Sequence, residues 1–350
     1  MSQPALLHLG WSEDLQTEFT PFADAGLVPA RVGVEHRSAY VLYTDDGDVW
    51  AELAGRLRHA GSRPTVGDWV AVRAESGGPA IVHAVLPRRT SFSRKTPWTE
   101  AAEQVVAANV DVVFVVTTLT DELSPRRLER YLTMAWESGA EPVIVLNKAD
   151  LCPDPAPLVA EVAAVAIGVP LVLTSAVTGE GIEELRGLVG FGRTAALLGS
   201  SGVGKSTLVN RLLGEDRQET RDLRADGKRG RHTTTRRELI PLPGGGLLLD
   251  TPGMRELQLW EASDGVDQAF RDVSELAAEC RFPDCEHRTE PGCAVRAALD
   301  VGELEPDRLE SYRKLQRELA RLDRQLDKRA RSDERRRRRN FARSRRRTVW

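Results

Sequence analysis

Short apolar runs, interrupted by turn residues, fill the chain from Arg31 to Phe92. The segments 39–43, 69–72 and 80–86 are rich in β-branched and aromatic residues, which favours strands. Asp-, Gly- and Pro-containing turns separate them. Several short strands in so small a region predict a closed barrel of the oligonucleotide-binding (OB) type, with an SH3-like barrel as the alternative.

Between residues 112 and 249, longer apolar runs alternate with segments whose apolar residues have helical spacing. The expected strands are 112–117, 141–146, 170–174, 194–198 and 247–249, and the expected helices are 125–138, 158–167 and 182–189. Such alternation predicts a parallel, doubly wound α/β sheet. From Glu303, leucines at intervals of three and four residues predict a helix that reaches Leu326 and packs on the protein's own body.

These patterns predict a multidomain protein. The expected parts are an N-terminal extension (1–30), an OB-fold barrel (31–92), an α/β domain (93–260), a helical domain (261–327) and an arginine-rich tail (328–350). A chain of 350 residues is long enough for two or three domains.

A phosphate-binding loop follows the expected strand 194–198. It matches the pattern G-x4-G-K-[ST] and consists of Gly199, Ser200, Ser201, Gly202, Val203, Gly204, Lys205, Ser206 and Thr207. Backbone N–H groups of such a loop surround phosphate oxygens, and the following helix directs its N-terminus at them. We expect Lys205 to bind the β- and γ-phosphates and Ser206 to bind Mg2+.

The base is selected by a second motif, Asn147-Lys148-Ala149-Asp150, which follows the strand 141–146. Guanine presents two N–H donors on one edge, and the Asp150 carboxylate can accept both. Adenine would leave that carboxylate unpaired, so the motif predicts guanine specificity. We expect Asn147 to brace the loop, Lys148 to lie along the purine, and Ser175 and Ala176 to offer backbone N–H groups to guanine O6.

A third motif, Asp250-Thr251-Pro252-Gly253, follows the strand 247–249. Asp250 is expected to hold Mg2+ through water, and the Gly253 amide to reach the γ-phosphate. Thr234, with Thr233 and Thr235 as alternatives, is expected to complete the Mg2+ shell. Met254 stands where many GTPases carry a glutamine that orients water, so His232 is the candidate for that role.

One alternative for His232 stays open, in which it contacts a partner instead. In addition, Arg231 or an arginine from a partner is a candidate arginine finger. We expect slow intrinsic hydrolysis of GTP that a partner accelerates.

The base-reading motif precedes the phosphate loop along the chain, the reverse of the usual order. Only positions in space matter to a ligand, so the order predicts a circularly permuted P-loop GTPase domain.

Three cysteines and a histidine cluster between residues 280 and 293, as Cys280, Cys285, His287 and Cys293. Three thiolates and one imidazole complete a tetrahedral Zn2+ site with no open position, which predicts one structural zinc ion. The alternative is a set of reduced, buried cysteines.

Charge is distributed unevenly, although the net charge is only −3. Residues 328–350 hold 12 Lys or Arg and 2 acids, a net of +10, which leaves −13 for residues 1–327. Residues 217–237 add eight basic residues against three acids. The cationic tail (328–350) and the basic segment 217–237, which overlaps the expected switch residues, favour RNA as a partner. The alternative is that the tail is only solvated and binds nothing. No signal peptide or apolar run of membrane-spanning length is recognised, so we expect a cytoplasmic protein without membrane contact.

Barrel, permuted GTPase and Cys/His cluster together resemble the ribosome small-subunit-dependent GTPase A family of bacteria. Besides the motifs above, the shared landmarks are Gly67-Asp68, Leu86-Pro87-Arg88, Ala107-Ala108-Asn109-Val110-Asp111 and Arg231-His232-Thr233-Thr234. The chain departs from the family in lacking a basic N-terminal arm and in its dense C-terminal arginines.

The resemblance implies a GTP hydrolase with GTP or GDP, Mg2+ and one zinc ion as cofactors. Its implied partners are the small ribosomal subunit, its rRNA and an assembly factor that is released late in subunit maturation; we expect a monomer. Two other functions remain: a nucleic-acid-binding regulator that uses GTP only as a conformational ligand, and an ATP-dependent kinase, which Asp150 disfavours.

Overall fold

The computed structural model describes residues 4–36, 39–60, 63–75, 78–95, 103–120, 123–215, 237–250, 263–321 and 324. Contacts divide the chain into two compact units. The first contains residues 1–93 and 105–257, and the second contains residues 94–104 and 258–350.

A five-stranded barrel opens the first unit. Its strands are β1 (Val28–Glu35), β2 (Tyr40–Thr44), β3 (Gly47–Leu53), β4 (Trp69–Arg73) and β5 (Ala80–Val85), with α3 (Gly55–Ala60) between β3 and β4. They pair in the order β1-β2-β3-β5-β4, and a β1–β4 ladder closes the barrel. Inward-facing side chains such as Val32, Leu42 and Val82 form its core and are not exposed. The OB-fold barrel predicted from the sequence is confirmed.

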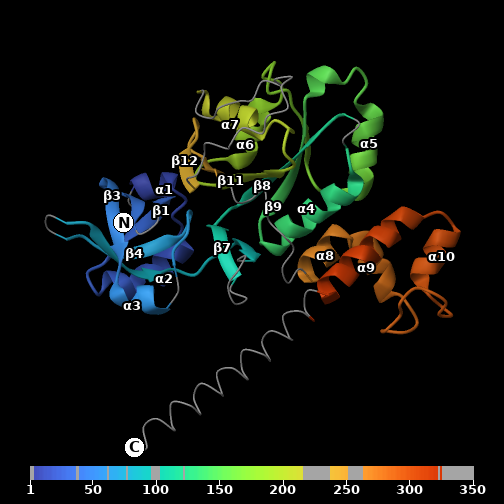
Figure 1. The fold of residues 1–350 in the computed structure, drawn as a ribbon, viewed down its shortest axis with the longest axis horizontal. Coiled ribbons are helices and arrows are strands. Elements are labelled where there is room, and N and C mark those ends of the chain that lie inside the picture. Colours follow the sequence, from blue (N-terminus) through green and yellow to red (C-terminus); the bar gives the residue numbers. More distant parts are fainter. Residues whose placement is uncertain are drawn as a thin grey trace, which may run out of the picture. The chain divides into compact units, whose positions relative to one another are not determined.

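The α/β part of this unit contains five parallel strands in the order β10-β9-β8-β11-β13, and β12 pairs antiparallel with β13. Their bounds are β8 (Val112–Thr118), β9 (Glu141–Asn147), β10 (Leu171–Leu173), β11 (Thr194–Gly199), β12 (Arg237–Pro241) and β13 (Leu247–Asp250). The helices are α4 (Pro125–Glu137), α5 (Ala156–Val165), α6 (Ile182–Val189) and α7 (Lys205–Leu213), with the 3-10 turn η1 (Ala149–Leu151). In Figure 1, α6 and α7 cover one face of the sheet, and α4 and α5 cover the other.

The alternating strands and helices expected from the sequence are confirmed. The apolar strands are buried on both faces, as parallel strands under helices must be. The predicted helix 158–167 is shifted, since α5 begins at Ala156 and ends at Val165.

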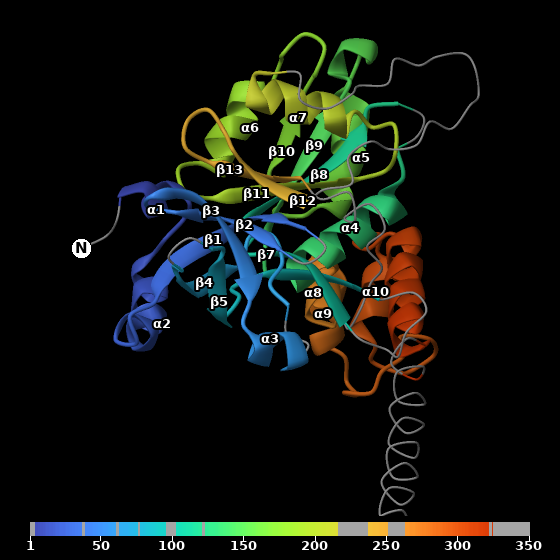
Figure 2. The same cartoon turned by 60° about the vertical axis from the view of Figure 1, so that its left-hand side comes forward.

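Barrel and α/β sheet form one continuous sheet of 11 strands. Strand β12 pairs with β13 on one side and with barrel strand β1 on the other, as Figure 2 shows. In the register, Glu238 is the Cα partner of both Val34 and Asp250. In the neighbouring pair of the β1–β12 ladder, Arg237 forms an ion pair with Glu35 at 3.0 Å.

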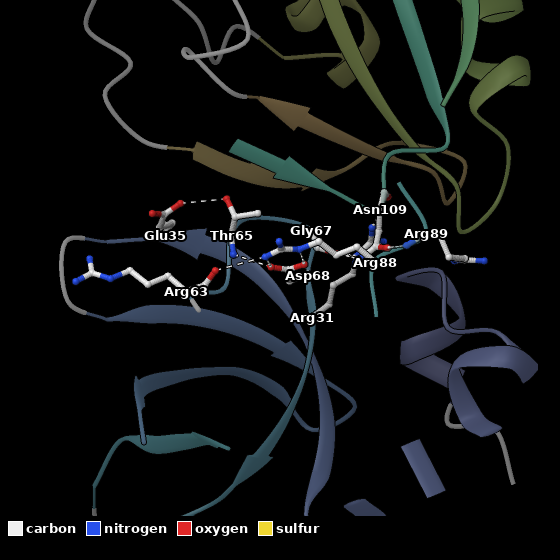
Figure 3. A network of polar contacts seen from close by, with 9 residues as sticks. All are labelled: Arg31, Glu35, Arg63, Thr65, Gly67, Asp68, Arg88, Arg89 and Asn109. Atoms are coloured by element: carbon white, nitrogen blue, oxygen red, sulfur yellow. Dashed lines mark hydrogen bonds and ion pairs between the residues drawn. The ribbon is translucent and has the colours of Figure 1, made fainter. Parts of the chain in front are cut away.

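Arg31 on β1 also links the barrel to the α/β sheet (Figure 3). Its side chain is 2% exposed and donates to the carbonyls of Gly67 (3.2 Å) and Asn109 (3.0 Å) and to Thr194 Oγ1 (2.8 Å). It also donates to the Leu9 carbonyl. Burial lowers the pKa of Arg31 to about 10. One guanidinium thus joins four backbone segments that are distant in the sequence.

The family landmarks that carry no nucleotide chemistry meet at this junction. Asp68 is fully buried and accepts two hydrogen bonds from Arg88, both at 2.7 Å. Asn109 Nδ2 donates to the Gly67 carbonyl at 3.0 Å, and Asn109 Oδ1 accepts from the Arg89 N–H at 3.0 Å. Gly67 has φ of +90°, and a Cβ there would lie 2.1 Å from the Ala108 carbonyl oxygen, so only glycine fits.

Two N-terminal helices, α1 (Pro4–His8) and α2 (Glu13–Ala23), precede the barrel. No element was expected there, because the first 30 residues lack a clear period. Ser12 caps α2 by accepting a hydrogen bond from the Leu15 N–H, and Leu6, Leu15 and Phe19 are buried.

The second unit is helical. It contains α8 (Ser263–Ala269), α9 (Arg271–Ala278), α10 (Ala294–Asp300) and a helix over residues 306–321. The predicted helix from Glu303 is confirmed but begins three residues later. Leu309, Tyr312 and Leu315, which lie on its apolar face, are buried. Arg308 pairs with Asp272 at 2.9 Å.

The remaining strands, β6 (Ser91–Lys95) and β7 (Glu103–Ala108), form a separate two-stranded sheet. Among the described residues, no helix is long and apolar enough to cross a membrane.

Candidate nucleotide site and metal centre

The candidate nucleotide residues lie at the carboxyl ends of neighbouring strands. Asn147 ends β9, Ser175 follows β10 by two residues, Gly199 ends β11 and Asp250 ends β13. These strands are parallel, so their carboxyl ends share one edge of the sheet. Open α/β sheets bind ligands at this edge.

The phosphate loop connects β11 to α7, as its motif predicts. Gly199 and Gly204 have φ of +149° and +94°, and a Cβ on Gly204 would lie 2.3 Å from Asn147 Nδ2. Lys205 is 8% exposed, and its ammonium group donates to the carbonyls of Gly199, at 2.7 Å, and Ser200. The loop therefore holds a cation beside backbone N–H groups at the start of a helix, an arrangement suited to phosphate.

Asn147 joins the base-reading motif to the phosphate loop. Its side chain is 1% exposed, and Nδ2 donates to the Val203 carbonyl at 2.8 Å. Its Oδ1 accepts from Thr174 Oγ1 at 3.2 Å and from the Ala176 N–H at 3.3 Å. Two motifs separated by about 50 residues of sequence are thus held by one amide side chain.

The remaining base-reading residues lie beside Asn147. Ser175 Oγ donates to Asp150 Oδ1 at 2.5 Å, which fixes the orientation of that carboxylate. Lys148 adopts the left-handed conformation, with φ of +63°, and starts the turn η1 that carries Asp150. Ser175 and Ala176 are buried. Asp150 and the Ser-Ala loop therefore lie together, as guanine recognition requires.

Of the expected switch and Mg2+ residues beyond the phosphate loop, one lies among the described residues. Asp250 is described and partly buried, whereas His232, Thr234, Gly253 and the alternatives to them lie outside the described residues. The arginine-rich tail from residue 328 lies outside them too.

Two arginines contact the site although no motif pointed to them. Arg127, in the first turn of α4, donates from Nη1 to Ser200 Oγ at 3.1 Å. Arg211 on α7 donates to the carbonyls of Ala176 and Val177, at 2.7 and 2.9 Å. Both are surface arginines in amphipathic helices, and spacing alone does not distinguish them from solvated charges.

The Cys/His cluster comes together in the second unit. The ligand atoms of Cys280, Cys285, His287 and Cys293 all lie within 4.8 Å of one another. His287 Nδ1 is 3.5 Å from the Sγ atoms of Cys280 and Cys293, which are 3.9 Å apart. A tetrahedral zinc ion with ordinary bond lengths requires edges of about 3.6 Å between N and S and about 3.8 Å between two S atoms. The donor set and its spacing therefore fit zinc.

Neighbouring residues hold the loop around this cluster. Arg313 donates to the His287 carbonyl at 2.6 Å, and Cys293 caps α10. The Glu290 carboxylate accepts the backbone N–H groups of Glu286, Arg288 and Thr289 at 2.7–3.1 Å. Backbone N–H groups, its own first, lower the pKa of Glu290 to about 2. Burial lowers the pKa of His287, which favours the neutral imidazole that metals bind.

Comparison with known proteins agrees with this arrangement. The model of the family described as "RsgA GTPase" matches residues 85–260. Proteins named "Small ribosomal subunit biogenesis GTPase RsgA" from Opitutus terrae and Streptomyces coelicolor are 52% and 50% identical to the chain. The first alignment covers 92% of the chain and 92% of the relative, and the second covers 94% and 90%.

Two solved structures are similar to this chain in fold. The crystal structure of YjeQ from Thermotoga maritima superposes with a TM-score of 0.65 at 30% identity, over 84% of this chain and 99% of that one. YloQ, described as a circularly permuted GTPase, superposes with a TM-score of 0.62 over 84% and 95%; at 24% identity it supports the fold alone. The permuted GTPase fold expected from the motif order is confirmed. The chain belongs to the RsgA GTPase family.

Proposed function

We propose that the protein hydrolyses GTP during maturation of the small ribosomal subunit, and that hydrolysis is coupled to its own release or to that of an assembly factor. The observation that carries the nucleotide part is the hydrogen bond from Asn147 Nδ2 to the Val203 carbonyl, because it places the base-reading and phosphate motifs in one site. The names of the relatives support the ribosomal part.

In the proposed site, Asp150 accepts the two N–H donors of guanine. The two N–H groups expected to meet O6 are engaged within the protein, because the Ser175 N–H donates to the Glu180 carbonyl at 3.1 Å and the Ala176 N–H donates to Asn147 Oδ1 at 3.3 Å. Lys148 lies along the purine. The phosphate loop, Gly199 to Thr207, surrounds the phosphates, and Lys205 neutralises the β- and γ-phosphates.

A bound Mg2+ would supply positive charge that neutralises the phosphates. Ser206 and Thr234 are the proposed ligands, and Asp250 acts through water. The Gly253 N–H contacts the γ-phosphate, and His232 orients the attacking water. Without a glutamine after Gly253, intrinsic hydrolysis is slow, and the subunit accelerates it by ordering these residues.

The proposed zinc ion is held by Cys280, Cys285, His287 and Cys293 and has a structural role, because all four coordination positions are filled by protein. RNA contacts are assigned to the barrel, the basic segment 217–237 and the tail 328–350. The protein acts as a cytoplasmic monomer on the subunit.

The decisive experiment measures single-turnover GTP hydrolysis by the full chain, with and without purified small subunits. We expect slow basal turnover and strong stimulation, and cosedimentation that is tighter with a non-hydrolysable GTP analogue than with GDP. Nucleotide-dependent binding without stimulated turnover would favour a regulator that uses GTP only as a ligand. Equal competition by ATP would exclude the guanine assignment.

The catalytic and RNA assignments have separate tests. His232→Ala should reduce the stimulated rate while GDP affinity is retained, and an unchanged stimulated rate would remove His232 from that role. Deleting residues 328–350 should weaken subunit binding and flatten its salt dependence; identical binding at all salt concentrations would remove the tail from the RNA contact.

A further inference from the structure

The outer face of barrel strand β3 carries a large aromatic side chain that is mostly uncovered. Trp50 is 57% exposed, whereas Ala51 and Leu53 on the same strand point into the barrel core. Side chains alternate along a strand, so Trp50 shares the outer face with Asp48 and Glu52. The tryptophan is therefore not needed to fill the core of the barrel.

The Trp50 ring is stacked against a second aromatic ring. The His36 imidazole lies 5.0 Å from it, measured between ring centroids, at an interplanar angle of 25°. His36 follows β1 directly, and its N–H donates at 2.9 Å to the carbonyl of Ala39, which precedes β2. The two stacked rings form a flat surface on the barrel, which we call the stacking platform.

The stacking platform lies where OB-fold barrels bind oligonucleotides. Their ligand face consists of strands 2 and 3 with the loops between strands 1 and 2 and between strands 4 and 5. The strand order β1-β2-β3-β5-β4 makes β3 the third strand, and His36 belongs to the first of these loops. Every base has a flat face, so aromatic side chains bind unpaired bases by stacking without reading their sequence.

Exposed arginines lie on the elements beside β3. Arg56, in α3, donates to the His83 carbonyl on β5 at 2.7 Å. Arg73 ends β4, and its Cα partner on β5 is Ile81, which is also the Cα partner of Glu52 on β3. Burial lowers the pKa of His83, and the nearby charges of Arg73 and Arg56 lower it further. Both guanidinium groups therefore lie near His83, where they can contact the phosphates of a strand that crosses β3 and β5.

The same face also carries acids, which restricts the kind of RNA that fits. Asp48 and Glu52 flank Trp50 along β3, and Arg58 lies 3.9 Å from Glu52 and offsets its charge. The acids leave the face without the concentrated positive charge that binds the phosphates of a duplex. The bases of a duplex are also stacked on one another, whereas those of an unpaired strand are free to stack on protein rings.

We propose that the stacking platform, formed by Trp50 and His36, binds unpaired RNA bases, and that Arg56 and Arg73 contact the adjoining phosphates. The inference rests on the proposed RNA contact of the barrel and deepens it, because it assigns single-stranded rather than duplex RNA to this face. The stacking contribution involves no charge, so it does not depend on salt, in contrast to the contribution of the arginine-rich tail.

Fluorescence anisotropy with the full chain tests this binding. The probes are a short labelled oligouridylate, an oligoadenylate of the same length and an RNA duplex of the same length. The variants are Trp50→Ala, Trp50→Phe and His36→Ala. Phe191→Ala is the matched control, because Phe191 is also 57% exposed and also contacts a histidine ring, that of His8, but lies outside the barrel.

We expect Trp50→Ala to weaken both single strands by about tenfold, at low and at high salt, and to leave duplex binding unchanged. Trp50→Phe should retain most of the affinity, since a phenyl ring also stacks, and His36→Ala should lose about threefold. Phe191→Ala should bind all three probes as the wild-type chain does. GDP affinity should be the same in all variants, which shows that they are folded.

Three results would overturn the inference. The first is an affinity of Trp50→Ala for single strands equal to that of Phe191→Ala, and the second is an equal loss for the duplex. The third is a Trp50→Ala variant that binds small subunits more weakly but single strands normally, which would assign the face to a subunit protein. Failure of the proposed function is distinct, because small subunits would then not stimulate GTP hydrolysis, whatever the oligonucleotide affinities.

Discussion

Replacing Arg31 by methionine should destabilise the junction between the barrel and the GTPase sheet. Methionine has a similar length but cannot donate to the four acceptors that the guanidinium contacts. With about 1.5 kcal/mol for each bond to a charged group, these contacts contribute about 6 kcal/mol. Burial of the charge lowers the pKa of Arg31 from 12.5 to about 10, but the value for each bond is already net of desolvation. The expected loss of unfolding free energy is therefore about 6 kcal/mol.

Urea unfolding followed by tryptophan fluorescence measures this loss. Trp69 is a suitable reporter, since its ring lies 5.5 Å from the Arg31 guanidinium carbon and 4.8 Å from Trp11. Arg73→Met is the matched control: Arg73 is exposed on β4 and makes one 3.4 Å contact with the Ala25 carbonyl. The control should lose less than about 0.5 kcal/mol. An Arg31→Met midpoint equal to that of the control would refute the assigned role of the junction.

Three further substitutions test the two candidate sites. Asp150→Asn should weaken GDP by at least about a hundredfold and favour XDP, whose C2 oxygen can accept from the amide; competition binding measures both, and retained GDP preference would place Asp150 away from the base. Cys285→Ser should reduce bound zinc from one ion per chain to none and lower the unfolding temperature of the second unit; metal analysis that still finds one ion would contradict the cluster. Arg127→Ala should raise the KM for GTP by about threefold without changing kcat, because one hydrogen bond at the phosphate loop is lost; identical steady-state kinetics would mean that this bond is unimportant.

The sheet and the nucleotide motifs were predictable because their signals are local and strong. The run at 112–117 and the runs that end at Asn147 and Gly199 are mostly buried, so most of their residues are apolar. The second and third runs lead directly into the base-reading motif and the phosphate loop. The cysteine cluster was predictable for a similar reason, since its four ligands lie within one short segment.

The junction was not predictable from local signals. Arg31 is a single charge in a barrel strand, and nothing around it in sequence indicates that it is buried. Its acceptors come from Leu9, Gly67, Asn109 and Thr194, which only the tertiary fold brings together. Strand β3 was missed because its exposed positions weaken the apolar pattern, and α1 because a single short turn has no detectable period.

The two-residue ladder between β1 and β12 has a consequence for any attempt to shorten this protein. If the barrel were removed, the outer side of β12 would lose its partner strand, and its free backbone groups would be open to pairing with a second molecule. A truncated GTPase region would therefore tend to self-associate. Activity measurements on such a fragment would report on its aggregates as well as on its chemistry.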